Sequence, residues 1–111
     1  MLSTVNVVVR KAPGLEPAVL GLRAAYSMLA NGGFETRILY MGDGVFNLLS
    51  VPGYVGGLLE RFRDEGGMVC ALETSMEERG LSEDDVIKGV EIVDNEAAAE
   101  MIQEADATTT F

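Results

Sequence analysis

Cys70 lies in the stretch GMVCALETSMEERGL, residues 67 to 81, and is the only cysteine of the chain. A thiolate is a strong nucleophile, but it needs access to its substrate and a pKa low enough to ionise. The chain has no histidine. Cys–His and Ser–His–Asp nucleophile systems within one chain are therefore excluded, as are histidine-ligated metal sites. The groups that remain for covalent chemistry are an unassisted thiolate, hydroxyls and carboxylates. We expect no metal and no cofactor.

Two interpretations of Cys70 stay open from the residues alone. If the strand MVCAL ends at Cys70, the thiol lies at the start of the helix that follows, where the helix dipole and free N–H groups lower its pKa. If the strand continues, Met68, Cys70 and Leu72 share one face, and burial raises the pKa of the thiol. The first interpretation predicts a nucleophile and the second a core residue.

Other candidate residues follow the expected strands. Glycines in Gly42-Asp43-Gly44 allow a tight turn that presents backbone N–H groups to an anion, but Asp43 argues against phosphate. Ser75 is a hydroxyl at a helix start with no base beside it, which is typical of a cap. Arg79 either pairs with a nearby glutamate at the surface or lines the pocket and attracts an anionic sulfur species.

Strand and helix patterns alternate along residues 1–111, which we interpret as one domain. Expected strands are 4–10, 34–41, 68–72, 90–93 and 107–111. Expected helices begin at Glu16, Tyr54, Thr74, Ser82 and Asp94 or Asn95, with Thr74 and Ser82 as caps. This alternation predicts a three-layer α/β sandwich with a mostly parallel sheet of about five strands and helices on both faces. Ligands gather at the carboxyl ends of such strands.

The charge of the chain limits the classes of partner. Eighteen acidic residues against eight basic ones give a formal charge of −10, which disfavours nucleic acid and anionic membrane surfaces. The longest apolar runs are too short to span a membrane, and the start MLSTVNVVVRK lacks the pattern of a signal peptide. A single cysteine fits a reducing compartment. We therefore expect a cytoplasmic protein.

The chain resembles the DsrE/DsrF-like family, which includes the sulfur-relay TusBCD proteins. The resemblance rests on the order and spacing of VNVVVRKAP, AAYSMLANGGFET, ILYMGDGVFNLL, TSMEERGL and DDVIKGVEIVD, followed by an alanine-rich helix and EADATTTF. It implies an α/β sandwich that assembles into trimers or hexamers. Active members carry sulfane sulfur as a persulfide on a cysteine and exchange it with a small, TusA-like sulfur-carrier protein. The apolar turn VFNLLSVPGYV, which we expect to be exposed, agrees with association.

One departure from the family pattern concerns the thiol. Aligned on Arg79-Gly80, the family's two cysteine positions fall on Leu72 and Ser75, two and five residues after Cys70. A two-residue insertion in ALETS would restore the match. The leading prediction is thus a sulfur-relay protein that holds a persulfide on Cys70. The alternative is a non-catalytic oligomeric subunit or binding module with Cys70 in the core. In either case the expected pocket residues are Gly42, Asp43, Gly44, Glu73, Thr74, Ser75 and Arg79.

Overall fold

The structure, a computed structural model, describes residues 3–49 and 53–111 and consists of five strands that alternate with helices. The strands are β1 (Thr4–Val9), β2 (Glu35–Tyr40), β3 (Met68–Leu72), β4 (Glu91–Val93) and β5 (Ala107–Thr110). The α-helices are α1 (Glu16–Ala30), α2 (Gly53–Asp64), α3 (Glu73–Glu78) and α4 (Asn95–Glu104). Two 3₁₀ helices, η1 (Gly42–Leu48) and η2 (Glu83–Asp85), lie in the connections.

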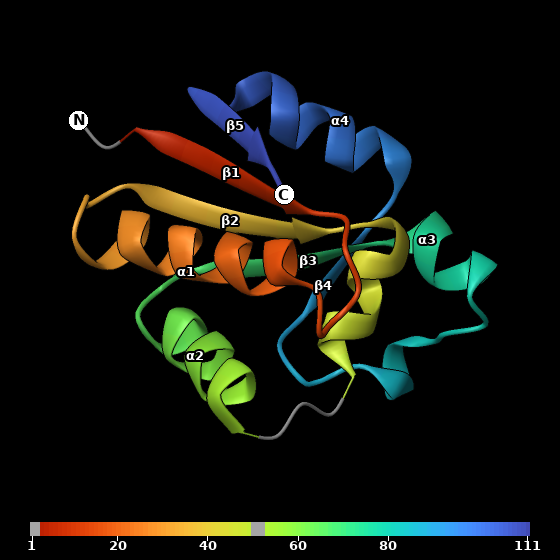
Figure 1. The fold of residues 1–111 in the computed structure, drawn as a ribbon. Coiled ribbons are helices and arrows are strands. Elements are labelled where there is room, and N and C mark those ends of the chain that lie inside the picture. Colours follow the sequence, from red (N-terminus) through yellow and green to blue (C-terminus); the bar gives the residue numbers. More distant parts are fainter. Residues whose placement is uncertain (1–2, 50–52) are drawn as a thin grey trace.

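All strands pair in parallel, in the order β4-β3-β2-β1-β5. Helices α1 and α2 cover one face of the sheet and α4 covers the other (Figure 1). The predicted α/β sandwich is therefore confirmed. The chain moves outward from β1 through β2 and β3 to β4, then returns across the sheet to place β5 on the other side of β1. The strand order thus reverses at β1, and such a reversal opens a crevice at the carboxyl ends of the strands.

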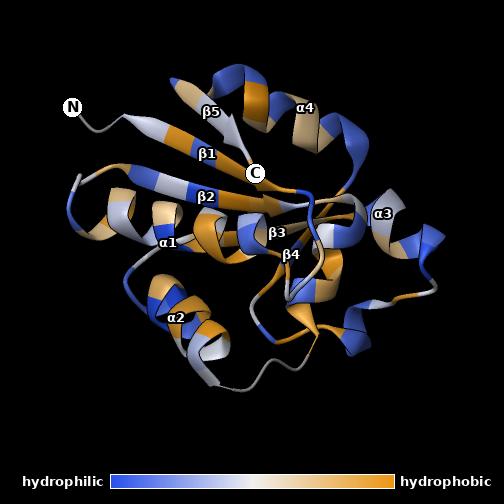
Figure 2. Cartoon of the chain, viewed as in Figure 1, coloured by the Kyte–Doolittle hydropathy of each residue, from blue (hydrophilic) through white to orange (hydrophobic). Residues whose placement is uncertain are grey.

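Two apolar cores follow from the alternation of side chains along each strand. On the α1 and α2 side, strand residues such as Val7, Ile38 and Val69 pack against Leu22 and Phe62. The second core, beneath α4, consists of Val8, Leu39, Cys70, Leu72, Val93, Ala98 and Met101. Hydrophobic residues occupy the carboxyl-terminal half of β2, whereas its amino-terminal half is hydrophilic (Figure 2). The cores therefore stabilise the end of the sheet at which the loops of the crevice begin.

The apolar segment after β2 is folded differently from the prediction. It forms η1, and both Val45 and Leu48 are 0% exposed, so the expectation of an exposed apolar turn is wrong for these residues. Val45 and Leu48 are three residues apart, so they lie on one face of the 3₁₀ helix, and this face packs into the core on the α1 and α2 side of the sheet. At the other end of the segment Tyr54 is 63% exposed, as expected, and residues 50–52 lie outside the described residues.

Asp94 or Asn95 is the expected cap of the last helix, and Asp94 caps α4 by accepting from the backbone N–H of Ala97 at 2.8 Å. The other two expected caps have different outcomes. Helix α3 begins at Glu73 with no side-chain cap, and the hydroxyl of Thr74 donates instead to Asn95 Oδ1 at 3.1 Å, so the predicted threonine cap is wrong. At η2 the carboxylate of Asp85 accepts from the backbone N–H of Ser82 at 2.8 Å, as the capping pattern predicts. Within the described residues, no helix has both the length and the apolar character that crossing a membrane requires.

Candidate functional site

A pocket of about 400 Å³ lies at the reversal of strand order, between the carboxyl ends of β1 and β5. Its lining consists of Arg10, Lys11, Gly42, Asp43, Arg79, Thr110 and Phe111. A second hollow adjoins it, sharing Arg10, Gly42 and Thr110 with the first and reaching Ser75. We call this pocket and the adjoining hollow the switch-point crevice. It occupies the place where open parallel sheets bind their ligands.

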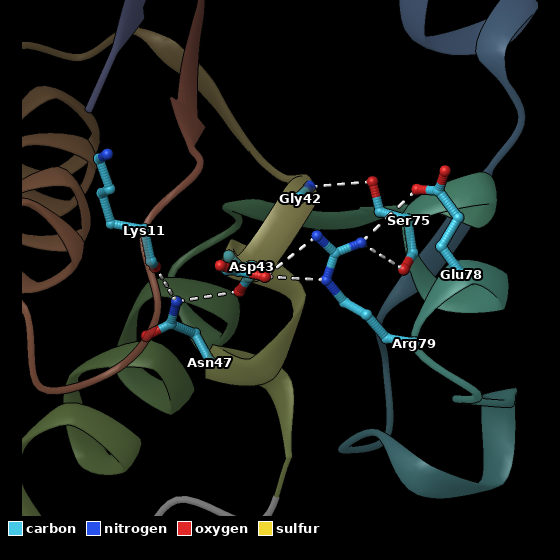
Figure 3. Close-up of polar contacts among 8 residues, drawn as sticks. Lys11, Gly42, Asp43, Asn47, Ser75, Glu78 and Arg79 are labelled. Carbon is cyan, nitrogen blue, oxygen red and sulfur yellow. Dashed lines mark hydrogen bonds and ion pairs between the residues drawn. The ribbon is translucent and has the colours of Figure 1, made fainter.

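The buried side chain of Asn47 fixes the loop after β1. Its Nδ2 donates to the carbonyl oxygens of Lys11 at 2.8 Å and Gly44 at 2.9 Å (Figure 3). Asn47 is 4% exposed, so it satisfies two carbonyl groups that would otherwise lose water as the chain folds. The backbone N–H of Arg10 also donates to the carbonyl of Phe111 at 3.0 Å, which joins this loop to the end of β5.

The opposite wall of the crevice is held by Ser75, in the first turn of α3. Its hydroxyl accepts a hydrogen bond from the backbone N–H of Gly42 at 2.9 Å, and Ser75 is 5% exposed. Gly44, two residues after Gly42, packs against the backbone of Val9. A β-carbon at Gly44 would clash with the carbonyl oxygen of Val9. The glycines of Gly42-Asp43-Gly44 thus have separate roles, since Gly42 faces the crevice and Gly44 lets η1 approach β1.

Arg79 lines the crevice rather than pairing with the glutamates Glu77 or Glu83. Its NH2 lies 3.0 Å from the Oδ1 atom of Asp43, and its NH1 donates to the carbonyl of Ser75 at 3.0 Å. A longer contact of 3.6 Å joins NH1 to Glu78. Figure 3 shows the guanidinium between Asp43 and Ser75. These contacts hold the guanidinium at the edge of the crevice, with 23% of the side chain exposed.

Cys70 lies inside β3, in register with Leu39 of β2 and Glu91 of β4. The strand continues to Leu72, so the thiol does not reach the start of α3. Cys70 is 0% exposed and belongs to the core beneath α4. Of the two interpretations drawn from the residues, this geometry matches the one in which the strand continues and the thiol is buried.

The surroundings of Cys70 also disfavour its ionisation. Burial raises the pKa of the thiol from an ordinary 9.0 to about 11. This pKa already includes a smaller upward effect of the Glu91 carboxylate and a downward effect of the Arg37 guanidinium. At pH 8 a thiol with this pKa is about a hundredfold less ionised than an ordinary one, since each pKa unit is a factor of ten. The thiolate that sulfur exchange requires is scarce at Cys70.

The remaining expected site residues separate into two regions. Gly42, Asp43, Ser75 and Arg79 meet at the crevice. Glu73 lies instead in a groove formed by α3, η2 and β4. Thr74 contacts Asn95, at the start of α4. The structure therefore does not bring Glu73 and Thr74 into one site with the glycines after β2.

Sequence reasoning missed several residues of the crevice, among them Arg10, Lys11, Thr110 and Phe111, and also Asn47, which holds one of its walls. A weak signal was present for Asn47, which is the one polar side chain in the apolar run VFNLL. The basic pair Arg10-Lys11 directly follows a strand, which places it at the carboxyl edge. Thr110 carried no signal, because only the pairing of β5 with β1 brings it beside Arg10.

The lining of the crevice suits binding better than covalent chemistry. Three cationic side chains, one carboxylate and the hydroxyl of Thr110 provide charge and hydrogen bonds. None of these lining groups is a thiol, and among residues 3–49 and 53–111 no base is hydrogen-bonded to the hydroxyl of Ser75 or Thr110. The groups present can hold and orient a polar ligand.

Comparison with curated proteins finds relatives of matching length. The uncharacterized protein MK0008 of Methanopyrus kandleri is 35% identical, over 99% of this chain and 95% of its own length. The uncharacterized protein MJ0989 of Methanocaldococcus jannaschii is 30% identical, over 96% of this chain and 97% of its own length. These relatives establish kinship along the whole chain and carry no assigned activity.

Solved structures and a family model give the same relationship. The YchN protein of E. coli superposes with a TM-score of 0.85 at 27% identity, with both chains covered completely. MTH1491 of Methanobacterium thermoautotrophicum, described as a protein of unknown function, gives a TM-score of 0.81 at 18% identity over both complete chains, which shows the fold alone. The family model named DsrE/DsrF-like family matches residues 4–111. The chain therefore belongs to the DsrE/DsrF-like family.

Proposed function

We propose that this chain is a non-catalytic binding subunit of a sulfur-relay system, in which Cys70 is a core residue and the switch-point crevice binds the ligand. Membership of the DsrE/DsrF-like family supports sulfur relay at the level of the family. The observation that carries the proposal is the position of Cys70, fully buried two residues before β3 ends. A persulfide carrier must present its terminal sulfur atom to a second thiolate.

The residues at the family's cysteine positions support the same proposal. Leu72 packs in the core beneath α4, and Ser75 uses its hydroxyl to hold Gly42. Neither can carry a persulfide. In place of a thiol, the carboxyl edge of this sheet has a crevice whose walls are joined by hydrogen bonds, and such fixed walls lower the entropic cost of binding a ligand.

Partners of the subunit belong to the same proposal. Family resemblance supports a homo-oligomer, as a trimer or hexamer, that docks a TusA-like carrier. The exposed side chains of Met68 and Ile102, 42% and 44% accessible, are compatible with association. A subunit of this kind contributes binding surface to the assembly and leaves the sulfur chemistry to thiols on other chains.

Intact mass spectrometry after treatment with sulfur donors tests the proposal. The native protein is incubated with polysulfide, thiosulfate or a persulfidated carrier protein and then weighed. We expect no added sulfur atom. A gain of about 32 Da that disappears in Cys70→Ala would overturn the proposal and establish the alternative, persulfide carriage on Cys70.

A matched variant shows that the assay can detect sulfur transfer at this edge. Ser75→Cys, made in a Cys70→Ala background, changes one atom and places a thiol on the wall of the crevice, at a family cysteine position. We expect this variant to gain sulfur from donors that leave the native protein unmodified. If only the variant gains sulfur, the native protein stays unmodified because of where its thiol lies and not because the donors are inactive.

A further inference from the structure

The charge of the crevice is opposite to that of the whole chain. The lining includes the cations Arg10, Lys11 and Arg79 and one carboxylate, Asp43, and a second carboxylate, Glu78, contacts Arg79 from outside the lining, so the local charge is still positive. The chain has only eight basic residues and a formal charge of −10. A local positive field within an acidic protein is the feature expected of an anion site, because distant acids are screened more strongly than groups in contact with the ligand.

Gly42 leaves a space that faces one of these cations, Arg79, and on its other side the backbone carbonyl oxygen of Arg10, which repels an anion. A β-carbon added at Gly42 would lie 3.8 Å from the carbonyl oxygen of Arg10 and 4.0 Å from NH2 of Arg79. One point in the crevice therefore lies within van der Waals reach of both walls. The φ of Gly42 is +55°, a conformation that side-chain-bearing residues rarely adopt, so the backbone also favours glycine here. An oxygen atom of a ligand at this point would face the guanidinium directly.

The guanidinium is held in place before any ligand arrives. Nε and NH2 of Arg79 contact one oxygen of Asp43, and NH1 is bound to the carbonyl of Ser75. A guanidinium has five N–H donors in a fixed plane, so these bonds leave donor capacity on the outward edge. Because Asp43 is exposed over 62% of its side chain, it orients the cation without sealing it from the crevice.

The lining also limits the class of ligand. Phe111 is the only apolar side chain that lines the pocket itself, whereas the adjoining hollow adds Val8, Met41 and Ile102. The polar groups that could hold an anion are therefore gathered in the pocket, and the hollow is its apolar extension. The volume of about 400 Å³ lies at the small end of ligand pockets. Arginine, lysine and hydroxyl groups are the usual donors to tetrahedral oxyanions. The combination favours a small, fully polar anion.

We propose that the switch-point crevice binds a small tetrahedral oxyanion, of the class of sulfate, sulfite and thiosulfate, through contact with Arg79 (Figure 3), while Arg10 and Lys11 add positive charge at the rim. This inference rests on the proposed function, in which the crevice is the binding site, and it names the class of ligand. Binding involves no covalent step. The anion neutralises the excess positive charge, and Asp43 opposes it.

Titration of the full chain with sulfate, followed by amide and Arg Nε shifts in NMR spectra at constant ionic strength, tests this inference. Sulfate cannot donate sulfane sulfur, so its binding is independent of any chemistry at Cys70. We expect saturable shifts centred on Gly42, Asp43 and Arg79, with a Kd in the millimolar range. Thiosulfate and phosphate are expected to bind similarly, whereas acetate, with fewer acceptor oxygens, is expected to bind more weakly.

Substitutions that change only charge make the test specific. Lys11→Gln and Arg10→Gln, both at exposed side chains, should each weaken sulfate binding about threefold or more, and Asp43→Asn should tighten it by a similar factor. Lys88→Gln removes an exposed cation outside the crevice and should leave the Kd unchanged.

Two results would overturn the inference. They are the absence of saturable shifts up to about 50 mM sulfate, and an equal loss of binding in Lys88→Gln and Lys11→Gln. Either result leaves the proposed function standing if Cys70 still gains no sulfur. Conversely, sulfur on Cys70 would remove the proposed function while sulfate binding at the crevice could still be measured.

Discussion

Ser75 Oγ accepts the backbone N–H of Gly42 across 2.9 Å and so joins the start of α3 to the turn after β2. The bond links the turn after β2 to the helix after β3, and these two strands are neighbours in the sheet. A hydroxyl in this place forms a wall of the crevice, whereas a thiol would place a nucleophile there. The difference of one atom therefore separates a structural role from a chemical one.

Removal of this hydroxyl should lower stability. Ser75→Ala leaves the N–H of Gly42, which is only partly accessible to water, without its acceptor, and we expect a loss of about 1–2 kcal/mol in the free energy of unfolding. Urea denaturation measures the change, and the melting temperature should fall by about 4–8 °C. Ser27→Ala, at an exposed serine of α1, is the matched control and should be neutral. Equal stability of the two variants would contradict the role given to Ser75.

Two glycine-to-alanine substitutions should have opposite effects. In Gly44→Ala the new β-carbon lies 2.9 Å from the carbonyl carbon of Val9 and closer still to its oxygen, so η1 must move away from β1. We expect a loss of about 3 kcal/mol. In Gly57→Ala nothing lies within 4 Å of the new atom, and alanine should stabilise α2 by about 0.5–1 kcal/mol. Thermal unfolding of both variants checks the pair, and a Gly44→Ala protein of native stability would contradict the packing described.

The strands, helices and their layers could be predicted from the sequence because each depends on local pattern. The β-branched, loosely alternating segment TVNVVV indicates a strand, and glycines mark the ends of the helices. The resulting order of strands and helices predicts a parallel sheet. The same reasoning could not predict whether Cys70 is buried. Every residue of MVCAL is apolar, so no change in polarity marks where the strand ends, and an offset of two residues decides whether the thiol is buried.

The composition of the crevice could not be predicted, because it depends on contacts between distant segments. Thr110 lies beside Arg10 only because β5 pairs with β1, and hydrogen bonds from Asn47 bring the loop after β1 against η1. The sequence suggests a nearby glutamate as an ion-pair partner of Arg79, whereas the structure pairs it most closely with Asp43, 36 residues earlier in the chain. No local pattern records such pairings.

Oligomer formation should be visible by light scattering. One helix, α4, covers its face of the sheet, and it leaves Ile102 44% exposed. We expect a mass of three or six times 11.9 kDa. Ile102→Gln should shift the population toward smaller species, whereas Leu20→Gln, at a comparably exposed leucine on α1, should not. A native protein of monomer mass at all concentrations would contradict the expected assembly.

The raised pKa of Cys70 predicts a pH dependence of stability. The folded state favours the neutral thiol, so its contribution is complete below the ordinary pKa of 9.0 and is lost as the pH rises toward about 11. Tyr40, whose pKa burial also raises, contributes to alkaline destabilisation in every variant. The free energy of unfolding should therefore fall more steeply between these pH values in the native protein than in Cys70→Ala. Parallel curves would show that the thiol titrates normally in the folded state.

The most direct test of the central claim is the rate at which a thiol reagent labels Cys70 in the folded protein, followed by intact mass. Ser27→Cys in a Cys70→Ala background supplies an exposed thiol on the same fold. We predict that Cys70 reacts only as fast as the protein unfolds, that its labelling accelerates in denaturant, and that the exposed control reacts at once. Labelling of native Cys70 at the rate of the exposed control would contradict its assignment to the core and restore it as a candidate sulfur carrier.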